Sequence, residues 1–113
     1  MKLVEQPISL TELKGMAEHG FGTLVKAVVD AEAGIMALDA ELHADEEALL
    51  LEHGSDQRDL WGINLYPDVE GDDWIEFDSM INLRPASGNR SRGVDDPAIR
   101  DRIRAIVARM VQR

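Results

Sequence analysis

Apolar positions recur at helical spacing near both ends of the chain. The first such stretch predicts a helix over Leu10–His19, with one apolar face. Ser9 and Glu12 form a capping box at its start, in which the Ser9 hydroxyl accepts from the Glu12 backbone N–H. Gly20 follows the last helical position, where glycine commonly ends a helix. The local signals therefore define both ends of this helix.

The second stretch predicts a longer amphipathic helix over Pro97–Val111. Asp96 is a good N-cap residue, and proline suits the first helical position. The apolar face consists of Ile99, Ile103, Ile106, Val107, Met110 and Val111. Arginines occupy much of the remaining surface, so one face of this helix is expected to pack on a core.

Between the two helices the apolar period changes to two, which is typical of half-buried strands. Strands are predicted over Leu24–Ala31, Ile35–His43, Trp61–Tyr66 and Ile75–Arg84. The segment Asp45–His53 is ambiguous. Its composition favours a helix, but it is short and a turn follows it. We favour a strand over Ala48–His53 and keep the helix as the alternative.

These elements predict an α+β fold in a single domain of residues 1–113. The sheet is expected to be an antiparallel five-stranded meander, or two hairpins with a middle helix. The N-terminal and C-terminal helices are expected to pack on one face of that sheet. The length of 113 residues and the hydrophobic fraction of 44% suit one domain with one core.

Composition excludes several chemistries. The chain has no cysteine, which excludes disulfides, thiolate nucleophiles and cysteine-ligated metals. It carries neither a secretion signal nor an apolar run near the ~20 residues of a membrane span, so we expect a cytoplasmic protein without a membrane partner. The net charge of −10 makes this an acidic protein and makes nucleic acid an unfavourable partner.

The charge is unevenly distributed along the chain. Residues 1–83 carry four cations against nineteen acids, a net charge of −15, whereas residues 84–113 carry eight arginines against three acids, a net charge of +5. In the simplest interpretation the basic segment lies on the acidic body of its own chain or of a partner subunit. The alternative is an anion-binding surface, because arginine binds carboxylate and phosphate alike.

The loop that precedes the second helix is the candidate anion site. Its glycines allow backbone N–H groups to approach an anion, although Gly88–Gly93 lacks the lysine that a Walker loop requires. The candidate ligands are Arg84, Asn89, Arg90, Ser91 and Arg92. We expect a phosphate- or carboxylate-bearing small molecule as partner. The competing interpretation is a loop whose arginines pair with the acidic body.

A second candidate is the polar face of the predicted sheet, which we expect to be open. It would display Asp39, Glu41, His43, Asn64, Tyr66, Glu76, Asp78, Asn82 and Arg84. A divalent metal ion is the possible cofactor, with His43, Asp45 and Asp78 as its ligands. The competing interpretation is a solvated sheet face on which charge prevents pairing with other strands.

Four runs of the sequence resemble a family of short prokaryotic proteins described only as a domain of unknown function. They are His43–Glu47 (HADEE), Leu60–Pro67 (LWGINLYP), Phe77–Pro85 (FDSMINLRP) and Gly88–Gly93 (GNRSRG). The resemblance covers nearly the whole chain. It implies membership of the family and brings no activity, cofactor or catalytic residue with it.

The leading functional hypothesis is a small binding or accessory protein that self-associates, for example as a homodimer, and binds anions at the arginine loop. One alternative is an enzyme that hydrolyses a phosphate-containing substrate with the help of a metal ion. Another is an interaction module whose arginine-bearing terminal helix binds an acidic partner. Whether the protein is an enzyme is left open by the sequence.

Overall fold

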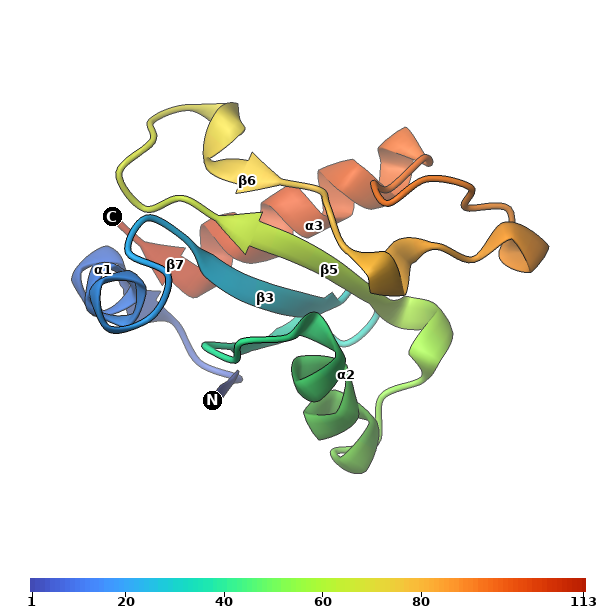
Figure 1. The fold of residues 1–113 in the computed structure, drawn as a ribbon, viewed down its shortest axis with the longest axis horizontal. Coiled ribbons are helices and arrows are strands. Elements are labelled where there is room, and N and C mark those ends of the chain that lie inside the picture. The colour runs from blue at the N-terminus through green and yellow to red at the C-terminus, as the bar shows by residue number, and fades with distance from the viewer.

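A computed structural model describes all residues 1–113 and confirms the α+β fold class. Five antiparallel strands form the main sheet in the order β1-β4-β3-β5-β6 (Figure 1). These strands are β1 (Lys2–Val4), β3 (Val25–Asp30), β4 (Ile35–Leu38), β5 (Leu60–Leu65) and β6 (Ile75–Glu76). The helices are α1 (Leu10–His19), α2 (His43–Glu52) and α3 (Pro97–Met110). None of these helices is long and apolar enough to cross a membrane.

Helix α1 has the predicted bounds, and its N-cap forms as expected. The Ser9 hydroxyl accepts a hydrogen bond of 3.0 Å from the Glu12 backbone N–H. Leu13 and Ala17 are the buried residues of the helix, on the face that the spacing predicted. The sequence prediction of this element is therefore confirmed.

Helix α3 begins as predicted, with the Asp96 carboxylate accepting from the Ala98 backbone N–H at 2.9 Å. It ends at Met110 rather than at Val111. Val111 is extended and begins β7 (Val111–Gln112), which pairs in parallel with β2 (Ile8–Ser9) next to α1. The last residue of the predicted helix thus takes part instead in a contact between the two ends of the chain.

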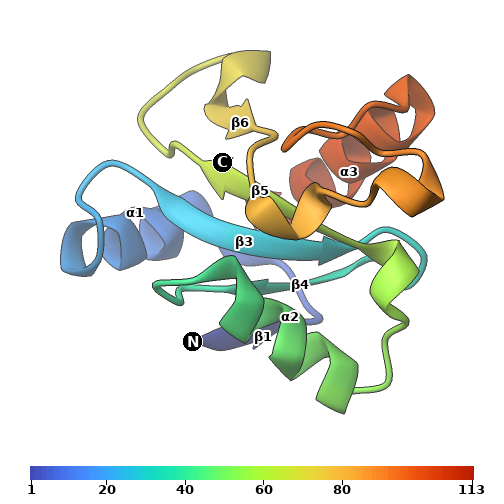
Figure 2. The same cartoon turned by 45° about the vertical axis from the view of Figure 1, so that its right-hand side comes forward.

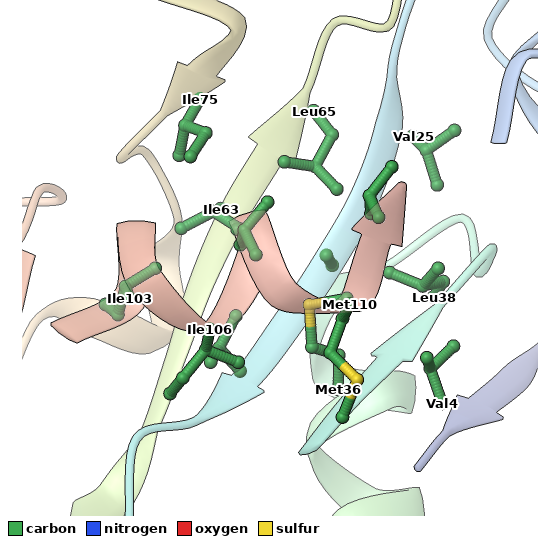
Figure 3. Packing of buried hydrophobic residues seen from close by; sticks show 14 of the residues in the cluster. Val4, Val25, Met36, Leu38, Ile63, Leu65, Ile75, Ile103, Ile106 and Met110 are labelled. Carbon is green, nitrogen blue, oxygen red and sulfur yellow. The ribbon is translucent and has the colours of Figure 1, made fainter. Parts of the chain in front are cut away.

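The larger core cluster lies between one face of the sheet and the two terminal helices. Alternate residues of β3, namely Val25, Ala27 and Val29, belong to it and are nearly or fully buried. Helix α1 adds its two buried residues, and α3 adds Ile103, Ile106, Val107 and Met110. Figure 3 shows side chains of α3 packed against residues of the strands. This cluster accounts for the period of two in the strands and the helical period in α1 and α3.

Helix α2 covers the opposite face of the sheet, so the predicted strand over Ala48–His53 is wrong. Leu50 of α2 is fully buried in a second cluster with Val28, Ala37 and Leu60, which point away from the larger core. Figures 1 and 2 show α2 on the other side of the sheet from α3. The helix-forming composition therefore outweighs the short length, because burial of Leu50 stabilises the helix.

Two hairpins around a middle helix are the correct alternative, and the simple meander is wrong. Strands β3 and β4 form the first hairpin, and β5 and β6 form the second. The fifth strand is β1, which the sequence analysis did not predict and which pairs with β4 at the edge of the sheet. Its three residues are too few to show a reliable period.

Two predicted strands are shorter in the structure. The strand predicted over Ile35–His43 ends at Leu38, because Asp39 adopts a positive φ of 70° that breaks the extended backbone. The strand predicted over Ile75–Arg84 ends at Glu76. Ser79 then accepts from the Ile81 backbone N–H, a local bond that competes with pairing in the sheet.

Candidate functional site

The polar face of the sheet is covered rather than open, which corrects the sequence interpretation. His43, Asn64 and Asn82 were expected on an exposed surface, but their exposed fractions are 7%, 7% and 0%. Only Asn64 lies on a strand, whereas His43 begins α2 and Asn82 lies in a turn after β6. The expected polar side chains therefore serve as internal hydrogen-bond partners as well as surface groups.

The side-chain amide of Asn82 forms hydrogen bonds to Gly62 of β5 that a neighbouring strand would otherwise form. Its Oδ1 accepts from the Gly62 backbone N–H at 2.8 Å, and its Nδ2 donates to the Gly62 carbonyl at 3.0 Å. The close approach requires glycine, because a Cβ at position 62 would lie 2.5 Å from the Cβ of Ser79. Nδ2 also donates to the Arg92 carbonyl at 2.9 Å, which connects β5 to the arginine loop.

Asn89 holds the arginine loop in its shape and is not available to an anion. It is only 6% exposed. Its Nδ2 donates to the carbonyls of Asn82 and Gly93 at 2.7 and 2.8 Å, and its Oδ1 accepts from the Asp95 backbone N–H at 2.8 Å. Its backbone also pairs with Arg84 in both directions. The geometry gives Asn89 a structural role.

The loop already binds a carboxylate of its own chain. The Arg90 backbone N–H donates to Asp95 Oδ2 at 2.7 Å, and the Ser91 hydroxyl donates to Asp95 Oδ1. The bond from Ser91, and to a lesser extent the bond from Arg90, lowers the pKa of Asp95 below its ordinary value. Two donors of the predicted anion site, the Arg90 backbone N–H and the Ser91 hydroxyl, are therefore used by Asp95.

Arg84 is likewise held by main-chain carbonyls. Its guanidinium donates to the carbonyl oxygens of Ile81, Arg58 and Leu60, and it lies 4.5 Å from the centroid of the Trp61 ring. Burial lowers the pKa of the Arg84 guanidinium. These contacts connect β5 to the segment after β6, so Arg84 stabilises the fold at this point.

Arg92 differs from the other loop residues because its side chain turns toward the sheet. Its Nε donates to Asp78 Oδ1 at 2.6 Å, in a pair that is about half exposed. Its two terminal nitrogens form no hydrogen bond. Asp78 thus orients the guanidinium and leaves its outer donors available. The side chain of Arg90, two residues earlier, is exposed and forms no ion pair.

The geometry does not support the metal site predicted from His43, Asp45 and Asp78. His43 is the first residue of α2, and its Nε2 donates to the Ile63 carbonyl at 2.7 Å. Asp45 is exposed on the same helix, and Asp78 pairs with Arg92. Nowhere in the chain do three His, Asp or Glu side chains lie close enough together to hold a metal ion.

The arginine loop and the sheet face do meet in one small cleft, which we call the basic cleft. Its volume is about 180 Å³, and its lining consists of Lys26, Leu42, His43, Ala44, Ser79, Met80, Ile81 and Arg92. Strand β3 supplies Lys26, α2 supplies His43, and the loop supplies Arg92. Residues far apart in the sequence are therefore brought together by α2 packing across the sheet.

Two cations of the basic cleft are incompletely neutralised. Lys26 forms no ion pair, and its Nζ lies 5.4 Å from the centroid of the Phe21 ring. Arg92 has one carboxylate partner at its Nε. Burial lowers the pKa of His43, so the imidazole is neutral at pH 7. Because the Nε2–H of His43 donates to the Ile63 carbonyl, Nδ1 is the ring nitrogen that can accept a hydrogen bond.

The sequence analysis missed Lys26 and Ser79 as members of this site. A signal for Lys26 was present, because it is the only charged residue among apolar ones in Val25–Val29. A cation at such a position either extends to solvent or lies near other polar groups. Ser79 offered no comparable signal, since serine is common near turns.

Comparison with known proteins identifies the family of the chain but no relative of known activity. No curated protein and no solved structure shows significant similarity to this sequence. A family model matches residues 2–110, nearly the whole chain, and so agrees with the resemblance carried by the four sequence runs. The chain therefore belongs to the family described as "Protein of unknown function (DUF5674)".

Proposed function

We propose that this protein binds a small molecule through a phosphate or carboxylate group placed in the basic cleft. The observation that carries the proposal is the convergence of Lys26 and Arg92 on one cleft with His43. This revises the location of the anion site, because the loop donors near Arg90 hold Asp95 instead. The anion would contact the side of the loop that faces α2.

Arg92 is prepared to bind such a group. Asp78 holds its Nε at 2.6 Å, which restricts the guanidinium before a ligand arrives. Its two terminal nitrogens could then contact two oxygens of a phosphate or carboxylate, the arrangement that guanidinium groups favour. Lys26 supplies a second positive charge as a point contact. A ligand hydroxyl, or a protonated phosphate oxygen, could donate to Nδ1 of His43.

The size and rim of the basic cleft restrict the ligand further. A volume of about 180 Å³ accommodates a compact anionic group and little more. Leu42 and Met80 line the cleft and are 58% and 62% exposed. These exposed apolar side chains would contact the part of the ligand that extends outside. The favoured ligand thus combines one compact anion with an apolar or aromatic portion.

A thermal-shift titration with phosphate, pyrophosphate, nucleoside monophosphates and small carboxylates tests the proposal. A binding anion should raise the Tm of the parent protein with ligand concentration. Arg92→Gln and Lys26→Gln should each reduce this rise, and added NaCl should weaken it. Arg90→Gln is the matched control, because it removes an exposed arginine of the same loop outside the cleft.

The proposal fails if no anion of the panel raises the Tm of the parent. It also fails if Arg90→Gln reduces the response as much as Arg92→Gln, since the effect would then reflect net charge alone. Circular dichroism of Arg92→Gln distinguishes lost binding from lost folding. If this variant is unfolded, Lys26→Gln provides the same test without removing the Asp78 ion pair.

A further inference from the structure

A second depression, which we call the acidic groove, lies between α2 and the end of β4 and is separate from the basic cleft. Its volume is about 510 Å³, and its lining consists of Met1, Asp39, Ala40, Glu41, Asp45, Ala48, Leu49 and Glu52. Four carboxylates therefore surround a partly apolar floor. None of the four takes part in an ion pair within the chain.

The spacing of these carboxylates does not suit a metal ion. No three acidic or histidine side chains are grouped closely enough to coordinate one cation. A groove with separated negative charges and an apolar floor instead suits a surface that presents several cations along its length, with small apolar side chains between them.

The basic segment of the same chain carries charges that remain largely unneutralised. Among its eight arginines, only Arg92 forms an ion pair with an acid of residues 1–83, namely Asp78. Arg104 pairs with Asp101 on its own helix. Ion pairing between the basic segment and the acidic body of its own chain is therefore limited to one arginine, while Arg84 and Arg109 donate to main-chain carbonyls of that body.

The exposed surface of α3 has the features that the acidic groove requires. Arg102 and Arg109 are exposed, and two small exposed residues, Ala105 and Ala108, lie between them. A separation of seven residues puts both arginines on one side of the helix, about 10 Å apart. Arg109 donates to the Gly34 carbonyl, and Arg102 forms no hydrogen bond or ion pair.

These two surfaces cannot meet within one molecule. Helix α2 and helix α3 lie on opposite sides of the sheet, as the two views of the ribbon show (Figures 1 and 2). Opposite charges that face away from each other on one chain favour contact between copies. This arrangement is heterologous, because the surface used by one copy differs from the surface used by the next.

We propose that a second copy of this chain places the Arg102 and Arg109 side of its α3 in the acidic groove. The carboxylates Asp45 and Glu52 of one copy then lie near the arginines of the other, with Ala105 and Ala108 over the apolar floor. Contacts of this kind between exposed charges weaken strongly with ionic strength. Association should therefore occur at low salt and decline at high salt.

Sedimentation velocity of the parent protein at 50 mM and 500 mM NaCl, over a range of concentrations, provides the first test. Concentration-dependent association at 50 mM that is lost at 500 mM is the expected result. A parent that stays monomeric at 50 mM NaCl overturns the proposal, as does association that is insensitive to salt. A monomer would leave a different basic protein as the candidate for the groove.

Charge reversal then locates the contact. The groove variant Asp45→Arg, Glu52→Arg and the helix variant Arg102→Glu, Arg109→Glu should each be monomeric alone, because like charges then face each other at the proposed contact positions. An equimolar mixture should associate again, since opposite charges then face each other. Self-association that persists in both variants, or a mixture that stays monomeric while both are folded, would contradict the proposed contact.

Matched controls carry the same charge changes elsewhere. The double variants Glu70→Arg, Asp72→Arg and Arg58→Glu, Arg90→Glu alter exposed residues outside both surfaces and should leave association unchanged. Their loss of association would show that net charge, rather than this contact, controls it. These experiments use no anionic ligand, so their outcome is independent of the basic cleft.

Discussion

Replacement of Asn82 by alanine should lower the free energy of unfolding by about 2–4 kcal/mol. The side chain is fully buried, and its amide forms three hydrogen bonds to main-chain groups: the Gly62 N–H, the Gly62 carbonyl and the Arg92 carbonyl. Alanine removes all three and leaves the N–H and the carbonyl of Gly62 without a protein partner, whereas the Arg92 carbonyl still accepts from the Ser79 backbone N–H at 2.9 Å. Strand β6 pairs with β5 only at Asn64 and Leu65, so no neighbouring strand can replace the amide.

The magnitude follows from the cost of each unpaired group. A buried donor or acceptor that loses its partner costs about 1–3 kcal/mol. Entry of water into the space left by the amide would reduce this cost, so the lower half of the range applies to each of the two Gly62 groups. A loss of this size is a large part of the roughly 5–15 kcal/mol available to a small domain.

Urea denaturation followed by tryptophan fluorescence is a suitable assay, because Trp61 is next to Gly62 in β5. The midpoint should fall while the slope stays the same, which indicates a change in stability alone. Gln57→Ala is the control, since it removes an exposed amide that forms no side-chain hydrogen bond. An unchanged midpoint for Asn82→Ala would refute the idea that this amide stands in for a strand.

Two further predictions concern the core. Ile103 is fully buried on α3, so Ile103→Ala should lower the free energy of unfolding by about 2–5 kcal/mol, and an unchanged urea midpoint would show that α3 is not packed as described. Glu46 is fully buried in α2, and desolvation raises the pKa of its carboxyl from 4.5 to about 9. Because the unfolded chain loses this proton at lower pH than the folded chain, stability should fall as the pH rises from about 5 to about 9. Glu46→Gln should remove that part of the decline, as urea midpoints measured across this pH range would show.

Local signals in the sequence were sufficient to predict both ends of α1 and the start of α3. Ser9 and Asp96 cap residues only two or three positions away, and the apolar faces of both helices follow from spacing alone. The same holds for β3 and β5, whose alternate residues enter the larger core. Such signals act between neighbours in the chain, so a single sequence is enough to reveal them.

For helix α2, local signals in the sequence were insufficient to decide between a helix and a strand. The composition of Asp45–His53 suits a helix, while its length and the following turn suit a strand. The contact of Leu50 with Val28 and Ala37 decides between them, and the sequence contains no direct sign of this contact. Once α2 lies across the sheet, the polar face can no longer be open to solvent.

The sequence analysis named two residues of the basic cleft, His43 and Arg92, but assigned them to two different sites. The excess of arginine near the C-terminus made the loop the candidate anion site, but the sequence could not show that Asp95 would bind the loop donors. Tertiary packing separated Arg92 from the rest of the loop and put it beside Lys26 and His43. These three residues come from segments joined only by the fold.

The sequence by itself thus determined the fold class, the terminal helices and the uneven distribution of charge. These depend on residue type and on spacing within a few positions. Only the tertiary structure decided that Asn82 would replace a strand, that the loop would bind its own carboxylate, and that a basic cleft and an acidic groove would form. Each of these depends on contacts between distant segments, which many alternative packings of the same local elements would change.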